Sequence, residues 1–181
     1  EEYGNYPLHA LPLKEHYQLH PCNPYAVARV AQEMISKLYA DSFGLDVMMT
    51  RSFNHIGPGQ REVFVIPSFV RQMLDAKTGN RPAISVGNVD IVRDFLDVRD
   101  VVDAYYKILF FGRKGEVYNV CSGVGYALRE VISQIAEIIR FSPELIVDPG
   151  KVRPRDNLVV IGDASKLKAE LNWSPSIALK E

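Results

Sequence analysis

Tyr25 and Arg29 are the two residues of this sequence whose types and spacing suggest acid–base chemistry. They lie four positions apart in the stretch NPYAVARVAQE, so on a helix their side chains share one face. A nearby cation favours the phenolate and lowers the pKa of a tyrosine from about 10, as a general acid or base near neutral pH requires. A second interpretation stays open, in which Tyr25 is an exposed residue beside a surface pair of Arg29 and Glu33.

The element that must position this pair is a helix over residues 24–43. Asn23 can cap its start, Pro24 suits the first helical position and Gly44 can end it. One stripe of apolar side chains at helical spacing runs along it, made of Val27, Val30, Ala31, Met34, Ile35 and Leu38.

The rest of the chain alternates between the two kinds of element. LDVMMTRSF has the length and apolar content of a buried strand, and the loop NHIGPGQ follows it at a favourable place for a site. Further strands are expected at AISV, GEVYNVCS and ELIVD. Further helices are expected at residues 67–77, 97–110, 128–139 and 164–171, with Asp97 and Asp100 forming the cap of the second. The predicted fold class is therefore α/β.

The composition excludes several classes of function. With 181 residues and 47% hydrophobic content, the chain can bury the core of one ordinary domain or of a substantial part of a larger protein. A net charge of -1 gives no global field for nucleic acid or an anionic membrane, and no run approaches the roughly 20 apolar residues that cross a bilayer. Two cysteines, Cys22 and Cys121, make no disulfide framework, which favours a cytoplasmic location.

Other polar clusters leave alternatives open. Arg93, Arg153 and Arg155 can bind phosphate oxygens through their planar guanidinium groups, or can pair with nearby aspartates as solvated surface. GVGYAL, at residues 123–128, lacks the third glycine of a dinucleotide fingerprint and is interpreted as a plain turn. We expect no metal site. The spacing of His9, His16, His20 and Cys22 matches no known set of metal ligands.

Seven segments together resemble, in order, the second half of an extended short-chain dehydrogenase/reductase acting on nucleotide sugars. They are YGNYP, NPYAVARVAQE, TRSFNHIGPGQ, VGNVDIVRDFLDVRDVVDAYYKIL, GEVYNVCSG, RPRD and GDASKLKAELNWSPSIALKE. The similarity covers nearly the whole chain. It implies the C-terminal part of a Rossmann-like fold joined to a small α/β substrate-binding domain.

The resemblance also implies a division of the chain. Residues 1–60 would complete the dinucleotide-binding Rossmann domain, including the catalytic helix. Residues 61–181 would mainly bind the nucleotide sugar, with Rossmann-side segments interleaved near residues 83–123. Members of this family begin with a glycine-rich Rossmann half and place a catalytic Ser or Thr just before the position of EEYG. We therefore expect the protein to continue before Glu1.

The catalytic and cofactor residues follow from the same resemblance. The family carries a YxxxK pair on this helix, in which the tyrosine transfers a proton and the lysine holds the nicotinamide ribose. Tyr25 matches the tyrosine, whereas Arg29 stands in the place of the lysine and keeps the charge on a longer, planar head. Phe53 and His55 are expected near the nicotinamide of a bound NADP or NAD.

The substrate residues are implied by matching position. Asn54 is expected to face the sugar or the diphosphate, and Arg93 and Arg153 to contact the diphosphate and nucleotide. Asp156 would accept a hydrogen bond from the nucleotide, and Val86 would form the wall beside the base. Arg71 is a weaker candidate.

FNHIGPGQ, RDFLDVRDVV and YNVCSG are most similar to enzymes of the family that reduce GDP-4-keto-6-deoxy-mannose. The expected activity is thus hydride transfer to C4 of a GDP-linked 4-keto-6-deoxy sugar. A 4,6-dehydratase or 4-epimerase that returns the hydride to the same sugar is an alternative, and a nucleotide-sugar binding module without turnover is another. A homodimer through helix 24–43 is implied, with no nucleic-acid or membrane partner.

Overall fold

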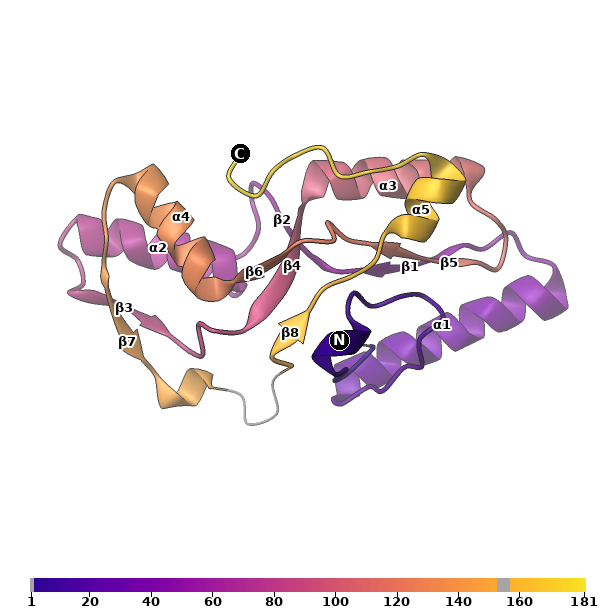
Figure 1. The fold of residues 1–181 in the computed structure, drawn as a ribbon, viewed down its shortest axis with the longest axis horizontal. Helices are drawn as coiled ribbons and strands as arrows, with labels where there is room; N and C mark the ends of the chain where they lie inside the picture. Colours follow the sequence, from indigo (N-terminus) through magenta and orange to yellow (C-terminus); the bar gives the residue numbers. More distant parts are fainter. Residues whose placement is uncertain (1, 153–156) are drawn as a thin grey trace.

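The computed structural model describes residues 2–152 and 157–181, which form an elongated α/β structure (Figure 1). Its α-helices are α1 (Pro24–Phe43), α2 (Val65–Lys77), α3 (Val98–Phe111), α4 (Leu128–Ile139) and α5 (Ser165–Leu171). Single 3-10 turns occur at η1 (Leu8–Ala10) and η2 (Pro149–Lys151). The strands are β1 (Met49–Ser52), β2 (Asn54–Ile56), β3 (Ala83–Val86), β4 (Val92–Asp97), β5 (Val117–Val120), β6 (Gly125–Ala127), β7 (Glu144–Val147) and β8 (Val159–Val160).

Mostly parallel pairing joins the strands of the described residues into three small sheets. Strand β1 pairs in parallel with β5 at one end of the molecule, and β3 pairs in parallel with β7 at the other. Between them, β4 pairs in parallel with β2 and β8 and antiparallel with β6. Parallel strands separated by helices confirm the predicted α/β class.

Helix α1 has the bounds that its sequence predicts. The side chain of Asn23 accepts a hydrogen bond from Ala26 N at 2.8 Å, and Gly44 ends the helix in the left-handed conformation with φ 73°. The apolar stripe of α1, in contrast, is largely exposed, because among the described residues only Ala26 and Ala40 of this helix are buried.

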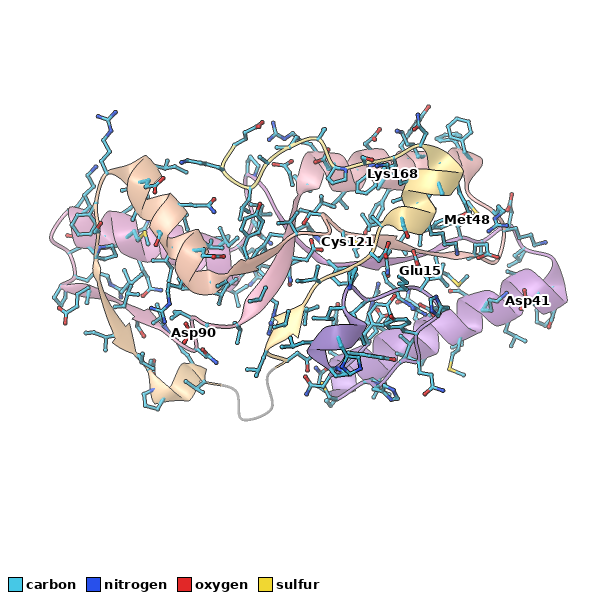
Figure 2. The ribbon with its side chains drawn as sticks, in the orientation of Figure 1. Glu15, Asp41, Met48, Asp90, Cys121 and Lys168 are labelled. Carbon is cyan, nitrogen blue, oxygen red and sulfur yellow. The ribbon has the colours of Figure 1, made fainter. Side chains whose placement is uncertain are left out.

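Two hydrophobic clusters of the described residues hold the structure together, one on each face of β4. The first lies between α2, α4 and β3 and contains Phe69, Met73, Ile84, Phe95, Val131 and Ile132. The second lies between α3, α5 and β5 and contains Leu96, Val101, Ile108, Tyr118, Leu167 and Trp173. Figure 2 shows side chains filling both ends, with Cys121 near the middle of the molecule. Because neighbouring residues of β4 belong to different clusters, this strand connects the two ends.

Four strands of the described residues were not predicted, namely β2, β4, β6 and β8. Strand β4 contains Arg93 and Asp94, two charged residues that interrupt the apolar pattern by which a buried strand is predicted. Asp94 is nevertheless buried in the folded protein. The turn predicted at residues 123–128 contains β6, and the loop predicted after β1 contains β2. Strands β2, β6 and β8 are each ordered by pairing with β4, and such pairing leaves little trace in local sequence.

Asp97 caps α3 as predicted, but Asp100 does not complete the cap. The carboxylate of Asp97 accepts from Arg99 N at 2.8 Å, and the Arg99 guanidinium lowers the pKa of that carboxyl. Asp100 is buried and accepts hydrogen bonds from Ser176 and from the backbone N of Ile177. Asp100 therefore fastens the C-terminal segment to α3.

Within residues 2–152 and 157–181, no helix combines the length and apolar character that a bilayer crossing needs. Cys22 is exposed and Cys121 is buried, and both are free thiols. Burial raises the pKa of the Cys121 thiol, so this cysteine packs as a small apolar side chain.

Candidate active site

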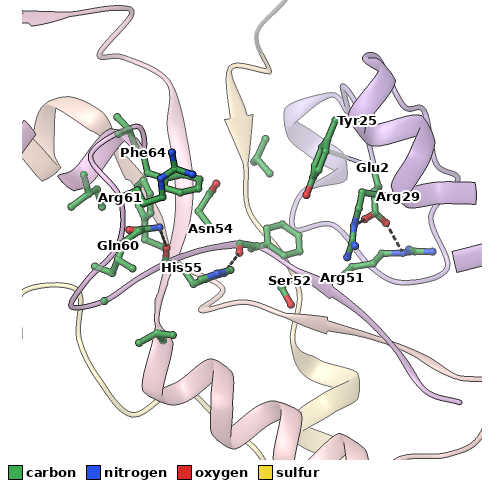
Figure 3. Close-up of a pocket in the computed structure, with 18 of the residues that line it drawn as sticks. Glu2, Tyr25, Arg29, Arg51, Ser52, Asn54, His55, Gln60, Arg61 and Phe64 are labelled. Atoms are coloured by element: carbon green, nitrogen blue, oxygen red, sulfur yellow. Dashed lines mark hydrogen bonds and ion pairs between the residues drawn. The ribbon is translucent and has the colours of Figure 1, made fainter. Parts of the chain in front are cut away.

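A cavity of about 820 Å³ opens between the first turns of α1, the β1–β2 segment and the start of α3 (Figure 3). Loop residues 57–61, the beginning of α2 and one residue of β4 also line it, together with residues 2–4, Leu13, Asn157 and Val160. The cavity thus collects side chains from elements that are far apart in the sequence.

Tyr25 and Arg29 both line this cavity, as their spacing on one helix face predicts. The cap at Asn23 places Tyr25 in the first turn of α1, where it is 65% exposed, and Figure 3 shows its hydroxyl directed toward the β1–β2 segment. An accessible phenol in a cavity can donate a proton to an oxygen of a bound molecule or accept one from it.

Arg29 is held by two groups of the protein. Its Nη1 donates to Oε1 of Gln32 at 2.7 Å, and its Nε lies 3.8 Å from Oε1 of Glu2. Glu33, the expected surface partner of Arg29, binds Arg51 instead. The interpretation of residues 29 and 33 as a surface pair is therefore wrong, because the strand beneath α1 supplies a buried cation to Glu33.

Arg51 is that cation, and sequence reasoning did not single it out. It is 8% exposed, and its Nε and Nη2 donate to the two carboxylate oxygens of Glu33 at 2.8 and 2.6 Å. Its Nη1 donates to the hydroxyl of Tyr3 and to the carbonyl of Glu15, each at 2.9 Å. An arginine inside the apolar strand LDVMMTRSF was the available signal, because a buried charge must be paired.

The network around Arg51 shifts the pKa values of its members. Burial raises the pKa of Tyr3 to about 12, although hydrogen bonds from Arg51 and to Asn119 work in the opposite direction. Burial also opposes the charge of Arg51, but its hydrogen bonds to Glu33 and Tyr3 outweigh that effect and raise its pKa. Tyr3 is thus a structural neutral phenol, distinct from the exposed Tyr25.

The β1–β2 segment places Phe53, Asn54 and His55 in the cavity wall. Asn54 Nδ2 donates to the carbonyl of Asp94 at 3.2 Å, so its amide is oriented by β4. His55 Nδ1 lies 3.3 Å from the carbonyl of Phe53, and Gln60 Nε2 donates to the carbonyl of His55 at 3.0 Å. These contacts fix the segment that follows β1, where the sequence predicted a site.

The other predicted residues lie elsewhere. Val86 is 1% exposed within the first hydrophobic cluster, and the Arg93 guanidinium donates to the carbonyls of Val92 and Asn157. Arg71 is on the surface of α2 in an ion pair with Asp75 at 3.4 Å. None of Val86, Arg93 and Arg71 is among the described residues that line the cavity. Arg153, Arg155 and Asp156 lie outside the described residues.

Further polar residues of the cavity wall were not predicted, among them Ser52, Tyr105, Gln60 and Asn157. Ser52 Oγ lies 2.7 Å from the hydroxyl of Tyr105, which joins β1 to α3. Oε1 of Gln60 and Oδ1 of Asn157 are buried acceptors for which the described residues provide no hydrogen-bond partner. A buried acceptor without a donor is costly, so these two oxygens are suited to a bound hydroxyl, amide or water.

Comparison with known proteins shows the family. The sequence profile described as GDP-mannose 4,6 dehydratase matches residues 1–181. GDP-6-deoxy-D-mannose reductase of Pseudomonas aeruginosa is 41% identical over 99% of this chain and 59% of its own length. GDP-mannose 4,6-dehydratase of Vibrio cholerae is 27% identical over 94% of this chain and 53% of its own length. The chain thus spans between half and three fifths of these relatives.

Solved structures agree with the sequence comparison. The structure of RMD from Pseudomonas aeruginosa complexed with NADPH is 40% identical with a TM-score of 0.92, and the match covers 99% of this chain and 59% of that one. dTDP-glucose 4,6-dehydratase from Bacillus anthracis in complex with NAD is 28% identical with a TM-score of 0.85, over 99% and 55%. This chain therefore belongs to the GDP-mannose 4,6-dehydratase family of short-chain dehydrogenases of the NAD-dependent epimerase/dehydratase type.

Proposed function

We propose that the protein carrying this chain uses NADPH or NADH to reduce a GDP-linked 4-keto-6-deoxy sugar. The observation that carries the proposal is the exposed side chain of Tyr25, which lines the same cavity as Arg29 and Asn54. The family membership and the 41% identity to a GDP-6-deoxy-D-mannose reductase support the choice of reaction and nucleotide.

The residues of the cavity fit a nicotinamide cofactor and a ketone together, because a phenol, a cation and an aromatic wall lie along one opening. The nicotinamide, when bound, supplies the hydride that reaches C4 of the sugar. Tyr25 donates a proton to the carbonyl oxygen, and the positive charge of Arg29 stabilises the phenolate that remains. Arg29 would also hold the ribose, with Phe53 and His55 on the nicotinamide side.

The substrate contacts are proposed from matching position. Asn54 would donate to the sugar or the diphosphate, and Arg93 and Arg153 would neutralise the diphosphate. Asp156 would accept from the nucleotide, and Val86 would support the wall beside the base.

The test is to mix the intact protein with NADPH and GDP-4-keto-6-deoxy-mannose and to follow the absorbance of the cofactor. We expect consumption by the wild type and a loss of about 10²-fold or more in Tyr25→Phe, since general acid catalysis contributes about that much. Tyr106→Phe, an exposed tyrosine on α3 that does not line the cavity, should behave as the wild type. Equal activity of Tyr25→Phe and wild type would rule out this role.

A dehydratase or 4-epimerase is the second enzyme candidate, favoured by the match to the Vibrio cholerae dehydratase. In such an enzyme the hydride returns to the same sugar. Turnover of a GDP-sugar with tightly held cofactor and no net oxidation would select this candidate over the reductase.

A binding module without turnover is the candidate of another class, favoured by the arginine in place of the family lysine. Arg29→Lys separates the two. Activity that arises only in Arg29→Lys would identify the natural protein as a binder, whereas activity in the wild type would exclude that class.

The assembly and location belong to the same proposal. A cytoplasmic homodimer through residues 24–43 would cover the exposed apolar side chains of α1, which include Met34, Ile35, Leu38, Tyr39 and Phe43. We also propose that residues 1–60 belong to the dinucleotide-binding domain and that residues 61–181 mainly form the substrate-binding domain. Sedimentation of wild type and of Ile35→Glu would test the interface, with a shift toward monomer expected in the variant.

A further inference from the structure

The guanidinium of Arg29 is steered by a carboxylate that is remote in sequence. Oε1 of Glu2 lies 3.8 Å from Nε of Arg29, while the side chains of the two residues are 15% and 41% exposed. On its own helix, Arg29 contacts Gln32, which is neutral. Glu2 therefore supplies the charge partner that orients an otherwise long and flexible side chain.

Glu2 can perform this task because its own position is determined by a fixed cation. Its Oε2 lies 3.9 Å from Nε of Arg51, so one carboxylate is shared between the two arginines. Arg51 is anchored by two hydrogen bonds to Glu33 and one to Tyr3. Figure 3 shows Glu2 between Arg29 and Arg51 at the edge of the cavity.

The charges of this group are balanced in pairs, two carboxylates against two guanidinium groups. Burial raises the pKa of Glu2, the charge of Glu33 raises it further, and Arg51 and Arg29 lower it. Removal of Arg29 would leave Glu2 to share Arg51 with Glu33, and removal of Glu2 would leave Arg29 without its charge partner. Glu2 and Arg29 should consequently depend on each other.

We propose that Glu2 is a positioning residue, which holds the Arg29 guanidinium at the wall of the cavity where the family has a lysine. The inference rests on the proposed function, because it concerns the cation that would hold the cofactor ribose. A lysine at position 29 would present a single compact charge and would need no such partner to set the plane of its head. Glu2 would thus make an arginine usable at this position.

The first measurement needs neither cofactor nor substrate. In the cofactor-free protein, the Arg29 Nε–H resonance, assigned by its disappearance in Arg29→Lys, should shift in Glu2→Gln and stay unchanged in Glu144→Gln. Glu144 is an exposed glutamate on β7, away from the cavity, and serves as the matched control. An unshifted resonance in Glu2→Gln would overturn the inference whatever the enzyme does.

The second measurement is the dissociation constant of NADPH, read from the fluorescence of the bound cofactor. Glu2→Gln should weaken binding by about threefold to tenfold in the Arg29 background and by less than twofold in Arg29→Lys. Glu2→Asp, which keeps the charge, should recover part of the loss and guards against a folding defect in Glu2→Gln. Equal weakening in both backgrounds would show that Glu2 acts independently of Arg29 and would refute the inference.

The outcomes separate this inference from the proposed function. No turnover of any GDP-keto-sugar by the wild type, together with the expected resonance shift, would reject the function and keep Glu2 as the partner of Arg29. Turnover by the wild type, with the NADPH affinity and the Arg29 resonance both unaffected in Glu2→Gln, would keep the proposed function and reject the role of Glu2.

Discussion

Replacing Asp94 with asparagine should destabilise the protein far more than its near-identical shape suggests. Asp94 is completely buried in β4. Its Oδ1 accepts from the backbone N and the hydroxyl of Ser122 at 2.8 and 2.6 Å. Its Oδ2 accepts from the backbone N of Gly123 at 2.9 Å and of Gly162 at 3.2 Å. One carboxylate therefore joins β4 to the turns that follow β5 and β8.

The magnitude follows from the donors that asparagine cannot satisfy. An amide NH₂ in the place of Oδ2 would face the N–H groups of Gly123 and Gly162 and leave both without an acceptor. Hydrogen bonds to a charged group contribute about 1.5–3 kcal/mol each, so two of them amount to about 3–6 kcal/mol. Burial raises the pKa of Asp94, and removing the charge recovers part of that penalty. We expect a net loss of about 2–4 kcal/mol in the free energy of unfolding.

The assay is urea unfolding followed by the fluorescence of Trp173, the single tryptophan, which is fully buried. Asp90→Asn is the matched control, because it makes the same substitution at an exposed aspartate four positions away. The ion-pair partner of Asp90 is Arg129. That variant should lose less than about 1 kcal/mol. A loss in Asp94→Asn no larger than in the control would refute the view that this carboxylate holds the central strands together.

Three further outcomes are expected. The pKa of Tyr3, about 12 in the folded protein against about 10 when unfolded, means that the neutral phenol stabilises the fold below pH 10. About 2–3 kcal/mol of stability should be lost as the pH rises from 10 to 12, and urea unfolding of Tyr3→Phe should lack this slope. Gly4→Ala should cost about 3 kcal/mol or more, because φ is 67° and the new Cβ would lie 2.0 Å from the carbonyl oxygen of His20. Gly59→Ala, with φ 80° and open space around it, should cost only about 1–2 kcal/mol in the same urea assay. Gly162→Ala would bring Cβ to 2.6 Å from Sγ of the buried Cys121 and to 2.7 Å from the ring of Phe53. Of these two only Phe53 borders the cavity, so its ring should move toward the cavity and NADPH titration should show weaker binding.

Local sequence was sufficient for the features that depend on neighbours within one turn or one strand. The cap at Asn23, the stop at Gly44 and the helical period predicted α1 to the residue, and the same period predicted that Tyr25 and Arg29 share a face. The alternation of helices with apolar strands predicted the α/β class. The resemblance of ordered motifs predicted the family, which the comparisons confirm.

Tertiary structure alone decided how the site is supported. The hydroxyl of Tyr3 donates to Asn119, which is 116 positions away. Arg51 binds Glu33, which is 18 positions away in the sequence. Strand β4 is ordered by its pairing with β2, β6 and β8, although half of its residues are charged.

The physical reason is the range of the interactions. Helix caps and periodicity act between residues that are at most four positions apart, so they can be seen in a short stretch of sequence. Buried charges and short strands are stabilised by whichever partners the folded chain brings to them, and their energy depends on that burial. For this protein, the sequence by itself determined which helix carries Tyr25 and Arg29. The fold determined that Glu2, Arg51 and the segment of Asn54 surround them.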